Sequence, residues 1–269
     1  MRVHFSVNAL KPAAKVARRA LAAEAVRLGV EVTTARAADV IVALGGDGTI
    51  LRAVHAYHGR PVLGLNLGGL GYLACVGESD FASALSLLAA GRYRISERTL
   101  LSVRKAGSRG VAAVALNDVV VVREMSGHAA RLDLSVDGRL ATRYMADGLI
   151  FATPTGSTAY SLAAGGPVLM PDSQSVVVTP MSPHALGVRP LVVHETAAFT
   201  VTSRPRANGD TTKTCVYADG RRIFLLGEGD AAEITKARDS AKLVELDGYE
   251  PYDVLARKLG WSGTNIKTP

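Results

Sequence analysis

The sequence has few cysteines, few aromatic residues and no long apolar segment. Its two cysteines, Cys75 and Cys215, are far apart and match no disulfide framework, zinc-ligand spacing or redox pair. No apolar run approaches the roughly 18 residues that a membrane-spanning helix needs. Polar and charged residues interrupt the opening segment, which excludes the apolar core of a signal peptide. We therefore expect a cytoplasmic protein with no membrane partner.

The sequence also lacks long runs of one charge. Its net charge is +7, but the basic residues are dispersed and no run of five like charges occurs. Aromatic residues make up 5% of the chain and are not interleaved with basic ones, which disfavours a nucleic-acid-binding module. Hydrophobic residues at 48% and charged residues at 20% are typical of globular proteins. The basic excess suits a phosphorylated small molecule at least as well as a nucleic acid.

The first third of the chain alternates apolar runs of strand length with segments of helical periodicity. A nearly all-apolar run such as Val40–Leu44 is typical of a parallel strand that is buried on both faces. The predicted strands are Arg2–Val7, Val30–Thr33, Val40–Leu44 and Pro61–Leu65, and the predicted helices are Ala13–Leu28, Thr49–Tyr57 and Asp80–Ala90. This order predicts an open parallel α/β domain over residues 1–95.

Residues 96–244 have a different pattern, in which short β-rich runs are separated by turn signals. Asp137-Gly138 and Asp219-Gly220 each divide two such runs, as in a β-hairpin. We expect an antiparallel, β-sandwich-like domain here, with residues Val111–Val122 as one strand run. A helix is predicted over Tyr249–Leu259, and the segment 245–269 is expected to pack back on the first domain.

The first group of residues with chemical meaning is Gly45-Gly46-Asp47-Gly48-Thr49, between a buried strand and a helix. Glycines let the backbone turn tightly, and the N–H groups at a helix start attract phosphate oxygens. An acid in such a loop repels phosphate, so its presence indicates metal binding or proton acceptance. The loop is neither a Walker P-loop nor a Rossmann fingerprint. On its own it predicts phosphoryl chemistry without a substrate.

Two further groups follow in the β-rich part of the chain. Asn117-Asp118 precedes an apolar run, and residues 147–160, DGLIFATPTGSTAY, form a strand that ends in a turn rich in hydroxyl groups. Hydroxyl groups, small residues and exposed backbone suit a flat, hydrogen-bonding ligand such as a nucleoside.

With these motifs together, the chain closely resembles the NAD kinase family over nearly its whole length. The resemblance rests on GGDGT at 45–49, GGLGYL at 68–73, ND at 117–118, DGLIFATPTGSTAY at 147–160, GGPV at 165–168, TPMSPHALGVRPLV at 179–192 and DG at 219–220. The GGDG loop alone is shared with lipid kinases and phosphofructokinases, which leaves a lipid or sugar kinase as the alternative. The TPTGSTAY and SPHALGVRP blocks make the match specific.

The resemblance implies transfer of a phosphoryl group to the 2′-hydroxyl of the adenosine ribose of NAD. Asp47 is implied as the catalytic base, Asn117 and Asp118 as contacts of the adenine and ribose, and Asp147 as a contact on the nicotinamide side. The full set of implied ligand-binding residues is Gly45, Gly46, Asp47, Gly48, Thr49, Arg52, Asn117, Asp118, His128, Asp147, Thr158, Ala159, Tyr160, Ser161 and Ala163.

The resemblance also implies substrates, a cofactor and an assembly. The donor is expected to be ATP or polyphosphate, and the cofactor Mg²⁺ or another divalent cation, with no ligand residue identified. A homodimer or homotetramer is expected to complete the NAD pocket through the segment Pro183–Arg189. The chain departs from the family pattern at Ala163, Met145 and Arg221, where members often have serine, arginine and glutamine.

Overall fold

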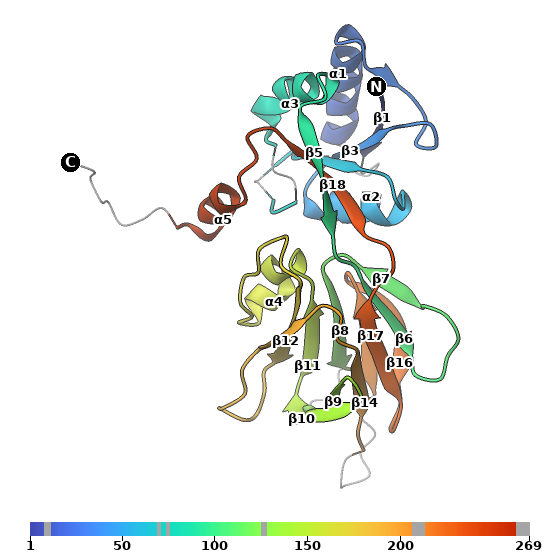
Figure 1. Ribbon diagram of the computed structural model, residues 1–269, viewed down its shortest axis with the longest axis vertical. Coiled ribbons are helices and arrows are strands. Elements are labelled where there is room, and N and C mark those ends of the chain that lie inside the picture. Colours follow the sequence, from blue (N-terminus) through green and yellow to red (C-terminus); the bar gives the residue numbers. More distant parts are fainter. Residues whose placement is uncertain (8–11, 69–70, 74–75, 125–127, 206–212, 262–269) are drawn as a thin grey trace, which may run out of the picture. The chain divides into compact units, whose positions relative to one another are not determined.

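The computed structural model describes residues 1–7, 12–68, 71–73, 76–124, 128–205 and 213–261 (Figure 1). The chain divides into two compact units. Unit 1 comprises Met1–Glu97 and Ala241–Pro269, and unit 2 comprises Arg98–Ser240. The sequence had placed these boundaries at 95/96 and 244/245. Unit 2 is therefore a continuous stretch of chain, whereas unit 1 is built from both ends.

Unit 1 contains a six-stranded sheet in the order β2-β1-β3-β4-β18-β5. The pairs β1–β2, β1–β3 and β3–β4 are parallel, as the alternating pattern predicted. The strand β18, which was not predicted in this sheet, also pairs in parallel with β4. Its strands are β1 (Arg2–Val7), β2 (Glu31–Val32), β3 (Val40–Leu44), β4 (Val62–Leu65), β5 (Tyr93–Arg98) and β18 (Ala241–Leu246). All five residues of β3 are buried, because helices cover both faces of the sheet.

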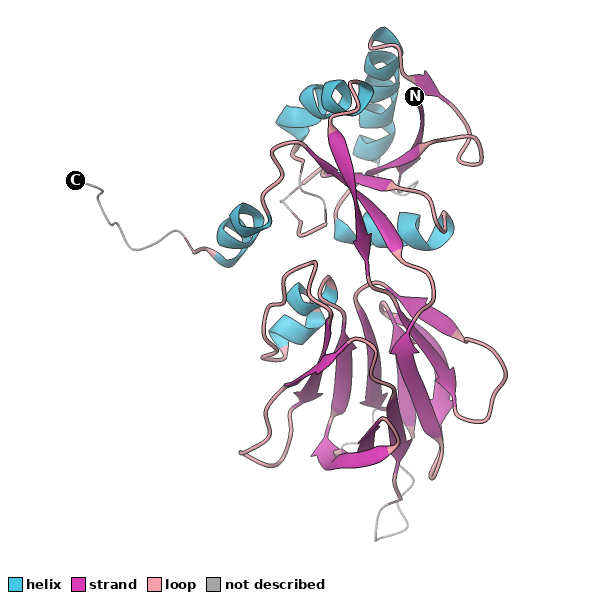
Figure 2. Cartoon of the chain, in the orientation of Figure 1, coloured by secondary structure: helices cyan, strands magenta, loops and turns pink. Residues whose placement is uncertain are grey.

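The helices of unit 1 are α1 (Pro12–Arg27), α2 (Asp47–Ala56), α3 (Phe81–Ala89) and α5 (Pro251–Leu259), and a short 3₁₀ turn spans Glu78–Asp80. Apolar residues of α1 and α3 share one core with Val40, Val42 and Leu44 of β3. The helix α2 covers the opposite face, where a Cβ added to Gly64 of β4 would lie 2.3 Å from Ile50 Cδ1. Helices are concentrated in this unit, as Figure 2 shows.

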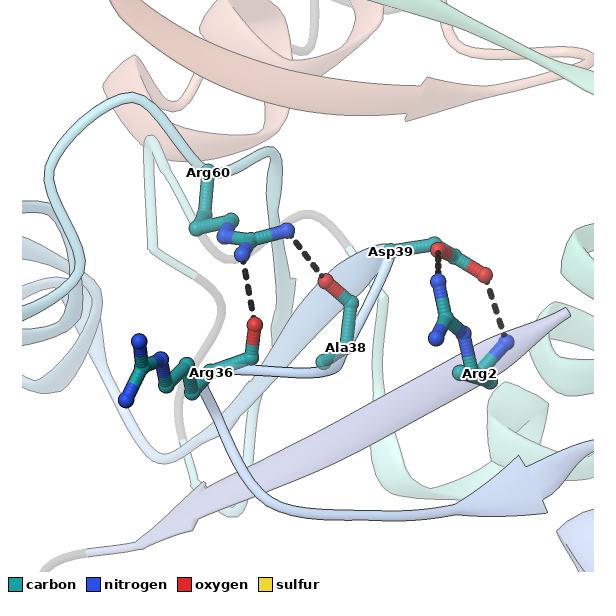
Figure 3. Close-up of polar contacts among 5 residues, drawn as sticks. All are labelled: Arg2, Arg36, Ala38, Asp39 and Arg60. Carbon is teal, nitrogen blue, oxygen red and sulfur yellow. Dashed lines mark hydrogen bonds and ion pairs between the residues drawn. The ribbon is translucent and has the colours of Figure 1, made fainter.

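Two arginines fasten the segment that leads into β3 (Figure 3). Arg60 donates hydrogen bonds to the carbonyl oxygens of Arg36 and Ala38 at 2.6 and 2.7 Å. The carboxylate of Asp39 accepts from the backbone N–H and the guanidinium of Arg2, both at 2.8 Å, and these bonds hold the pKa of Asp39 below its ordinary value. The start of β3 is thereby fixed, and the strand delivers the chain to the loop at Gly45.

Unit 2 is formed by two six-stranded antiparallel sheets (Figure 2). The first has the order β10-β9-β14-β17-β6-β7, with β6 (Leu101–Lys105), β7 (Ala113–Ala115), β9 (Ala130–Val136), β10 (Arg139–Ala146), β14 (Phe199–Ser203) and β17 (Ala231–Lys236). The second has the order β13-β12-β11-β8-β15-β16, with β8 (Asp118–Arg123), β11 (Gly148–Ala152), β12 (Ser175–Met181), β13 (Leu191–His194), β15 (Thr214–Ala218) and β16 (Arg221–Leu226).

An apolar core lies between these two sheets. Phe199 of the first sheet and Phe151 of the second meet there at a ring-centroid distance of 5.3 Å. On its other face the second sheet carries a smaller cluster, in which Ile150 and Val177 pack with Ala164 and Leu169. The segment that follows β11, with the short 3₁₀ turn Gly156–Thr158 and the helix α4 (Tyr160–Ala163), therefore covers this face. The predicted β-sandwich-like architecture is confirmed.

Several predicted elements begin or end one or two residues away from their bounds in the structure, and two differences bear on the site. The helix α2 begins at Asp47, two residues earlier than predicted, because Gly46 acts as its N-cap and Thr49 N–H already bonds to Gly46 O at 2.7 Å. The run Val111–Val122 is two strands: β7 pairs with β6 in the first sheet, and β8 lies in the second. In the part of the chain that the structure describes, no helix is long and apolar enough to cross a membrane.

Candidate functional site

The loop between β3 and α2 has a backbone that requires glycine at its first position. Gly45 has φ +149°, and a Cβ there would lie 2.4 Å from Thr49 Oγ1. Gly46 is extended, with φ −75° and ψ −177°, and caps the helix without a side chain. Asp47 and Gly48 are thus the first two residues of α2, where backbone N–H groups have no partner within the helix. The N–H groups at this helix start can donate hydrogen bonds to phosphate oxygens, which agrees with the expectation from the sequence.

The carboxylate of Asp47 is held by a second glycine-containing loop. Its Oδ2 accepts a hydrogen bond from Tyr72 N at 2.9 Å, and its Oδ1 accepts one from Leu73 N at 3.0 Å. A Cβ on Gly71 would lie 1.9 Å from Asp47 Oδ1, so only glycine fits there. The structure thus brings GGDGT and the end of GGLGYL together, while Gly69 and Leu70 of that motif lie outside the described residues. Sequence reasoning gave Gly71 no role.

A few polar and charged side chains lie in the region of the Asp47 carboxylate. Arg52 is exposed one turn along α2, and its Nη2 donates to Thr49 Oγ1 at 3.2 Å. Burial, and then the charge of Asp47, raises the pKa of the Tyr72 phenol. The Lys258 ammonium group of α5 lies 5.7 Å from the centre of the Tyr72 ring. The first turns of α2 therefore carry an acid and a cationic side chain, and Lys258 lies near the ring of the tyrosine whose backbone N–H holds that acid.

In unit 2, Asn117 and Asp118 lie where the chain passes from β7 into β8. Asp118 is buried, and burial together with the charge of Asp219 raises its pKa to about 7. Asn117 Oδ1 is also buried and accepts no hydrogen bond from the described residues. Buried polar atoms are normally hydrogen-bonded, so this unpaired acceptor indicates a ligand donor.

The turn that follows β11 packs directly on this pair. Thr153 Oγ1 donates to Leu116 O at 2.5 Å and accepts from Gly156 N at 3.1 Å. A Cβ on Gly156 would lie 1.9 Å from Asn117 O, so glycine is required for this approach. The TPTGSTAY block and the ND pair are therefore one cluster.

The hydroxyl groups of this block do not all face outward. Ser157 Oγ donates to Pro154 O at 2.7 Å, and Ser161 Oγ lies 2.8 Å from Thr179 Oγ1 in the interior. The Ser161 hydroxyl is therefore buried and paired within the protein. Tyr160 and Ala163 are exposed, while Thr158 and Ala159 are half-buried. These four residues form the accessible edge of the cluster.

Asp147 lies at the opposite end of β11 from this cluster. Its Oδ1 accepts from Arg123 Nε at 2.6 Å, and its backbone N–H donates to Met181 O. Because β11 separates Asp147 from Thr153, the two ends are about 20 Å apart at the usual rise of a strand. His128 is exposed, beside residues outside the described part of the chain. The sequence-predicted contacts of unit 2 thus form two groups, one at each end of β11.

The residues at which the chain departs from the family pattern are all exposed: Met145, Ala163 and Arg221. Met145 borders an open pocket of about 530 Å³ on the outer face of the first sheet. There the buried Asp133 accepts from Arg204 Nε at 2.9 Å, and Arg143 Nε lies 3.8 Å from it. None of the implied ligand-binding residues lines this pocket.

No protein-built metal cage occurs in the described ranges, where no three His, Cys, Asp or Glu side chains come together. Both oxygens of Asp47 are already engaged by backbone N–H groups. Mg²⁺ commonly binds through substrate phosphates, one or two carboxylates and water. The residues present therefore do not fit a resident metal ion that the protein alone holds.

Comparison with known proteins agrees with the motifs. The family model of the ATP-NAD kinase N-terminal domain matches residues 5–93, and that of the ATP-NAD kinase C-terminal domain matches residues 116–246. The NAD kinase of Symbiobacterium thermophilum is 41% identical over 230 residues, which cover 84% of this chain and 79% of that protein. The NAD kinase of Moorella thermoacetica is 38% identical over 259 residues, covering 92% and 79%.

Solved structures give the same result. The yeast NADH kinase complexed with NADH superposes with a TM-score of 0.83 at 25% identity, covering all of this chain and 90% of that one. The NAD kinase of Archaeoglobus fulgidus in complex with ATP has a TM-score of 0.80 at 26% identity, covering 97% and 99%. The lipid or sugar kinase alternative receives no support from these relatives.

Proposed function

Because the chain belongs to the NAD kinase family, we propose that it transfers a phosphoryl group from ATP or polyphosphate to the 2′-hydroxyl of the adenosine ribose of NAD. The observation that carries this proposal is the Asp47 carboxylate, which begins α2 and is fixed by two backbone N–H groups. The two N–H groups hold the carboxylate in one orientation. A base that is fixed before the substrate binds is well placed to take a proton from a hydroxyl group beside it.

Asp47 acts in this proposal as the general base. One of its oxygens takes the proton of the ribose 2′-hydroxyl while that hydroxyl oxygen attacks the terminal phosphorus of the donor. The bond from phosphorus to the leaving oxygen of the donor breaks, and ADP or shortened polyphosphate departs. The N–H groups at the start of α2 bind the phosphate oxygens, which offsets the repulsion between phosphate and Asp47.

The nucleotide is bound by the cluster of unit 2. Asn117 offers a buried, unpaired acceptor to an exocyclic amine or hydroxyl donor. Asp118 offers a buried carboxyl group beside it. Tyr160, with its ring exposed, offers an apolar face on which a base can stack.

The divalent cation arrives, in this proposal, with the phosphates of the donor. Bound with those phosphates, Mg²⁺ would neutralise part of the charge that develops as the phosphoryl group moves. The archaeal relative in complex with ATP supports ATP as one donor. Polyphosphate stays a second donor to be tested beside it.

A homo-oligomer explains why the implied contacts of unit 2 form two distant groups. The segment Pro183–Arg189 lies at the Asp147 end of β11, since His184 N donates to Met145 O at 2.9 Å. Leu186 in this segment is 95% exposed, which is unusual for a large apolar side chain. We propose that this end contacts the nucleotide of a second copy of the chain. A monomer at assay concentration, measured by light scattering, would contradict this part of the proposal.

The decisive experiment measures NADP formation by the purified protein. NAD and NADH are supplied as acceptors, each with ATP and with polyphosphate, in the presence of Mg²⁺. Diacylglycerol and fructose phosphate serve as competing acceptors for the alternative. Phosphorylation of NAD or NADH supports the proposal, whereas turnover of the lipid or sugar alone refutes it.

A further inference from the structure

The turn Asp219-Gly220 between β15 and β16 holds a segment about a hundred residues earlier in the chain. Asp219 Oδ2 accepts a hydrogen bond from Leu116 N at 2.7 Å. Asp219 Oδ1 accepts from Asn117 N at 2.8 Å and from Asp118 N at 3.2 Å. In return, Asp219 N–H donates to Asp118 O at 3.0 Å. One side chain thus binds three consecutive backbone amides.

The opposite side of the same segment is held by the turn after β11. Thr153 Oγ1 donates to Leu116 O, and Thr153 N donates to Asn117 O at 2.9 Å. Gly156 lies against Asn117 with no room for a Cβ. Asp219 therefore holds the three N–H groups and the Asp118 carbonyl group of this segment, and the turn after β11 holds the carbonyl groups of Leu116 and Asn117.

Because residues 116–118 are held from two sides, the side chains of Asn117 and Asp118 have fixed orientations. Asn117 presents its buried, unpaired Oδ1, and Asp118 presents its buried carboxyl group. The orientation of Asn117 does not follow from strand geometry, because this residue lies between β7 and β8, where the chain changes sheets. A loop that is fixed before the ligand binds loses less conformational entropy on binding.

We propose that Asp219 is a positioning residue, whose carboxylate holds the backbone of residues 116–118 so that Asn117 and Asp118 meet the adenosine half of NAD. This inference rests on the proposed function, and Asp219 itself touches neither substrate. Its negative charge also keeps a proton on Asp118 to higher pH, after the larger effect of burial. The Asp219-Gly220 motif is thus part of the substrate-binding apparatus as well as a hairpin turn.

The chain contains a matched control in the turn Asp137-Gly138 between β9 and β10. Asp137 and Asp219 have φ values of +50° and +47°, and the glycines that follow have +76° and +73°. Asp137 Oδ1 also accepts a backbone N–H, from Ala198 at 2.9 Å. The two turns share residue types and conformation, but only Asp219 is bonded to the Asn117-Asp118 segment.

The test compares Asp219→Ala, Asp219→Asn, Asp137→Ala and wild type in steady-state NADP formation. We expect the KM for NAD to rise about 10-fold or more in Asp219→Ala, because three amides lose their acceptor. Asp219→Asn keeps one acceptor oxygen and should raise this KM about 3-fold. The KM for ATP and the kcat should change less than about 2-fold, since the binding of NAD is weakened equally in the ground state and the transition state. Asp137→Ala should match wild type in all three parameters.

Hydrogen exchange provides a readout that does not depend on activity. In Asp219→Ala, or in Asp219→Asn if the alanine variant does not fold, the amides of residues 116–118 should exchange faster, with no such change in Asp137→Ala. Faster exchange together with the raised KM for NAD supports the proposal. An unchanged KM for NAD in an active, folded Asp219 variant overturns it. A wild-type protein that forms no NADP refutes the proposed function instead, so the two failures are distinct.

Discussion

Substitution of Gly71 by alanine should separate activity from stability. The added Cβ would lie 1.9 Å from Asp47 Oδ1 and 2.6 Å from its Cγ. To reach the 3.4 Å of an ordinary contact, the carboxylate must retreat by about 1.5 Å, which breaks its bonds to Tyr72 N and Leu73 N. A misplacement of roughly 1 Å at a reacting group can cost about 10²-fold in rate. We therefore expect kcat to fall about 10²-fold or more.

Stability should change far less in this variant, because the clash involves the end of a half-buried side chain that can rotate away. Losing two hydrogen bonds at such a site costs about 1–3 kcal/mol in unfolding free energy. Steady-state NADP formation and denaturant unfolding measure the two quantities. Gly68→Ala, in the same motif, is the control, since among the described residues its Cβ would meet only Asn66 Oδ1, at 4.0 Å. A Gly71→Ala enzyme with near wild-type kcat, or a Gly68→Ala enzyme equally impaired, would refute the reasoning.

Three further predictions concern single residues. Asp47→Asn should lower kcat by about 10²–10⁴-fold and largely keep the affinity for NAD, because an amide cannot serve as the base. Initial rates measure kcat and titration calorimetry measures the affinity. Near wild-type turnover would remove Asp47 from its role. Asp118→Asn should stabilise the protein at pH 8 by up to about 4 kcal/mol but not at pH 4, in denaturant unfolding at both pH values. In the folded protein the Asp118 carboxyl group has a pKa of about 7, whereas in the unfolded chain it releases its proton near pH 4. Between these two pH values the wild-type protein therefore becomes less stable as the pH rises. Gly156→Ala should lower thermal stability strongly, since its Cβ meets the backbone of Asn117, which cannot move aside; a wild-type melting temperature would contradict this.

Most of the fold was predictable from local patterns. The buried strand Val40–Leu44 and the hairpin at Asp219-Gly220 have signals within a few residues, and both were predicted correctly. The start of α2 was predicted too late, because glycine has low helix propensity, yet Gly46 serves as a cap and Gly48 lies within the first turn. Local propensity could not indicate either role.

The candidate site was less predictable, because its geometry comes from contacts that are distant in sequence. The run Val111–Val122 is divided into two strands at Asn117, whose backbone N–H donates to Asp219. No periodicity in the apolar run reveals this division. The placement of Asp147 and Asn117 at opposite ends of β11 becomes evident only from the strand register. The pairing of the Ser161 hydroxyl with Thr179 of β12 also joins residues 18 positions apart, and no local pattern indicates it.

The position of β18 constrains the order in which unit 1 can be completed. This strand is the last in the chain, yet it lies in the sheet between β4 and β5. During synthesis, β5 is made before its neighbour exists, and β4 keeps an open edge until residues 241–246 have left the ribosome. Unit 2, being continuous, can form its strand pairs during this interval. A chain that is cut short before Ala241 would therefore expose the unpaired edge of β4, a template for association with other chains.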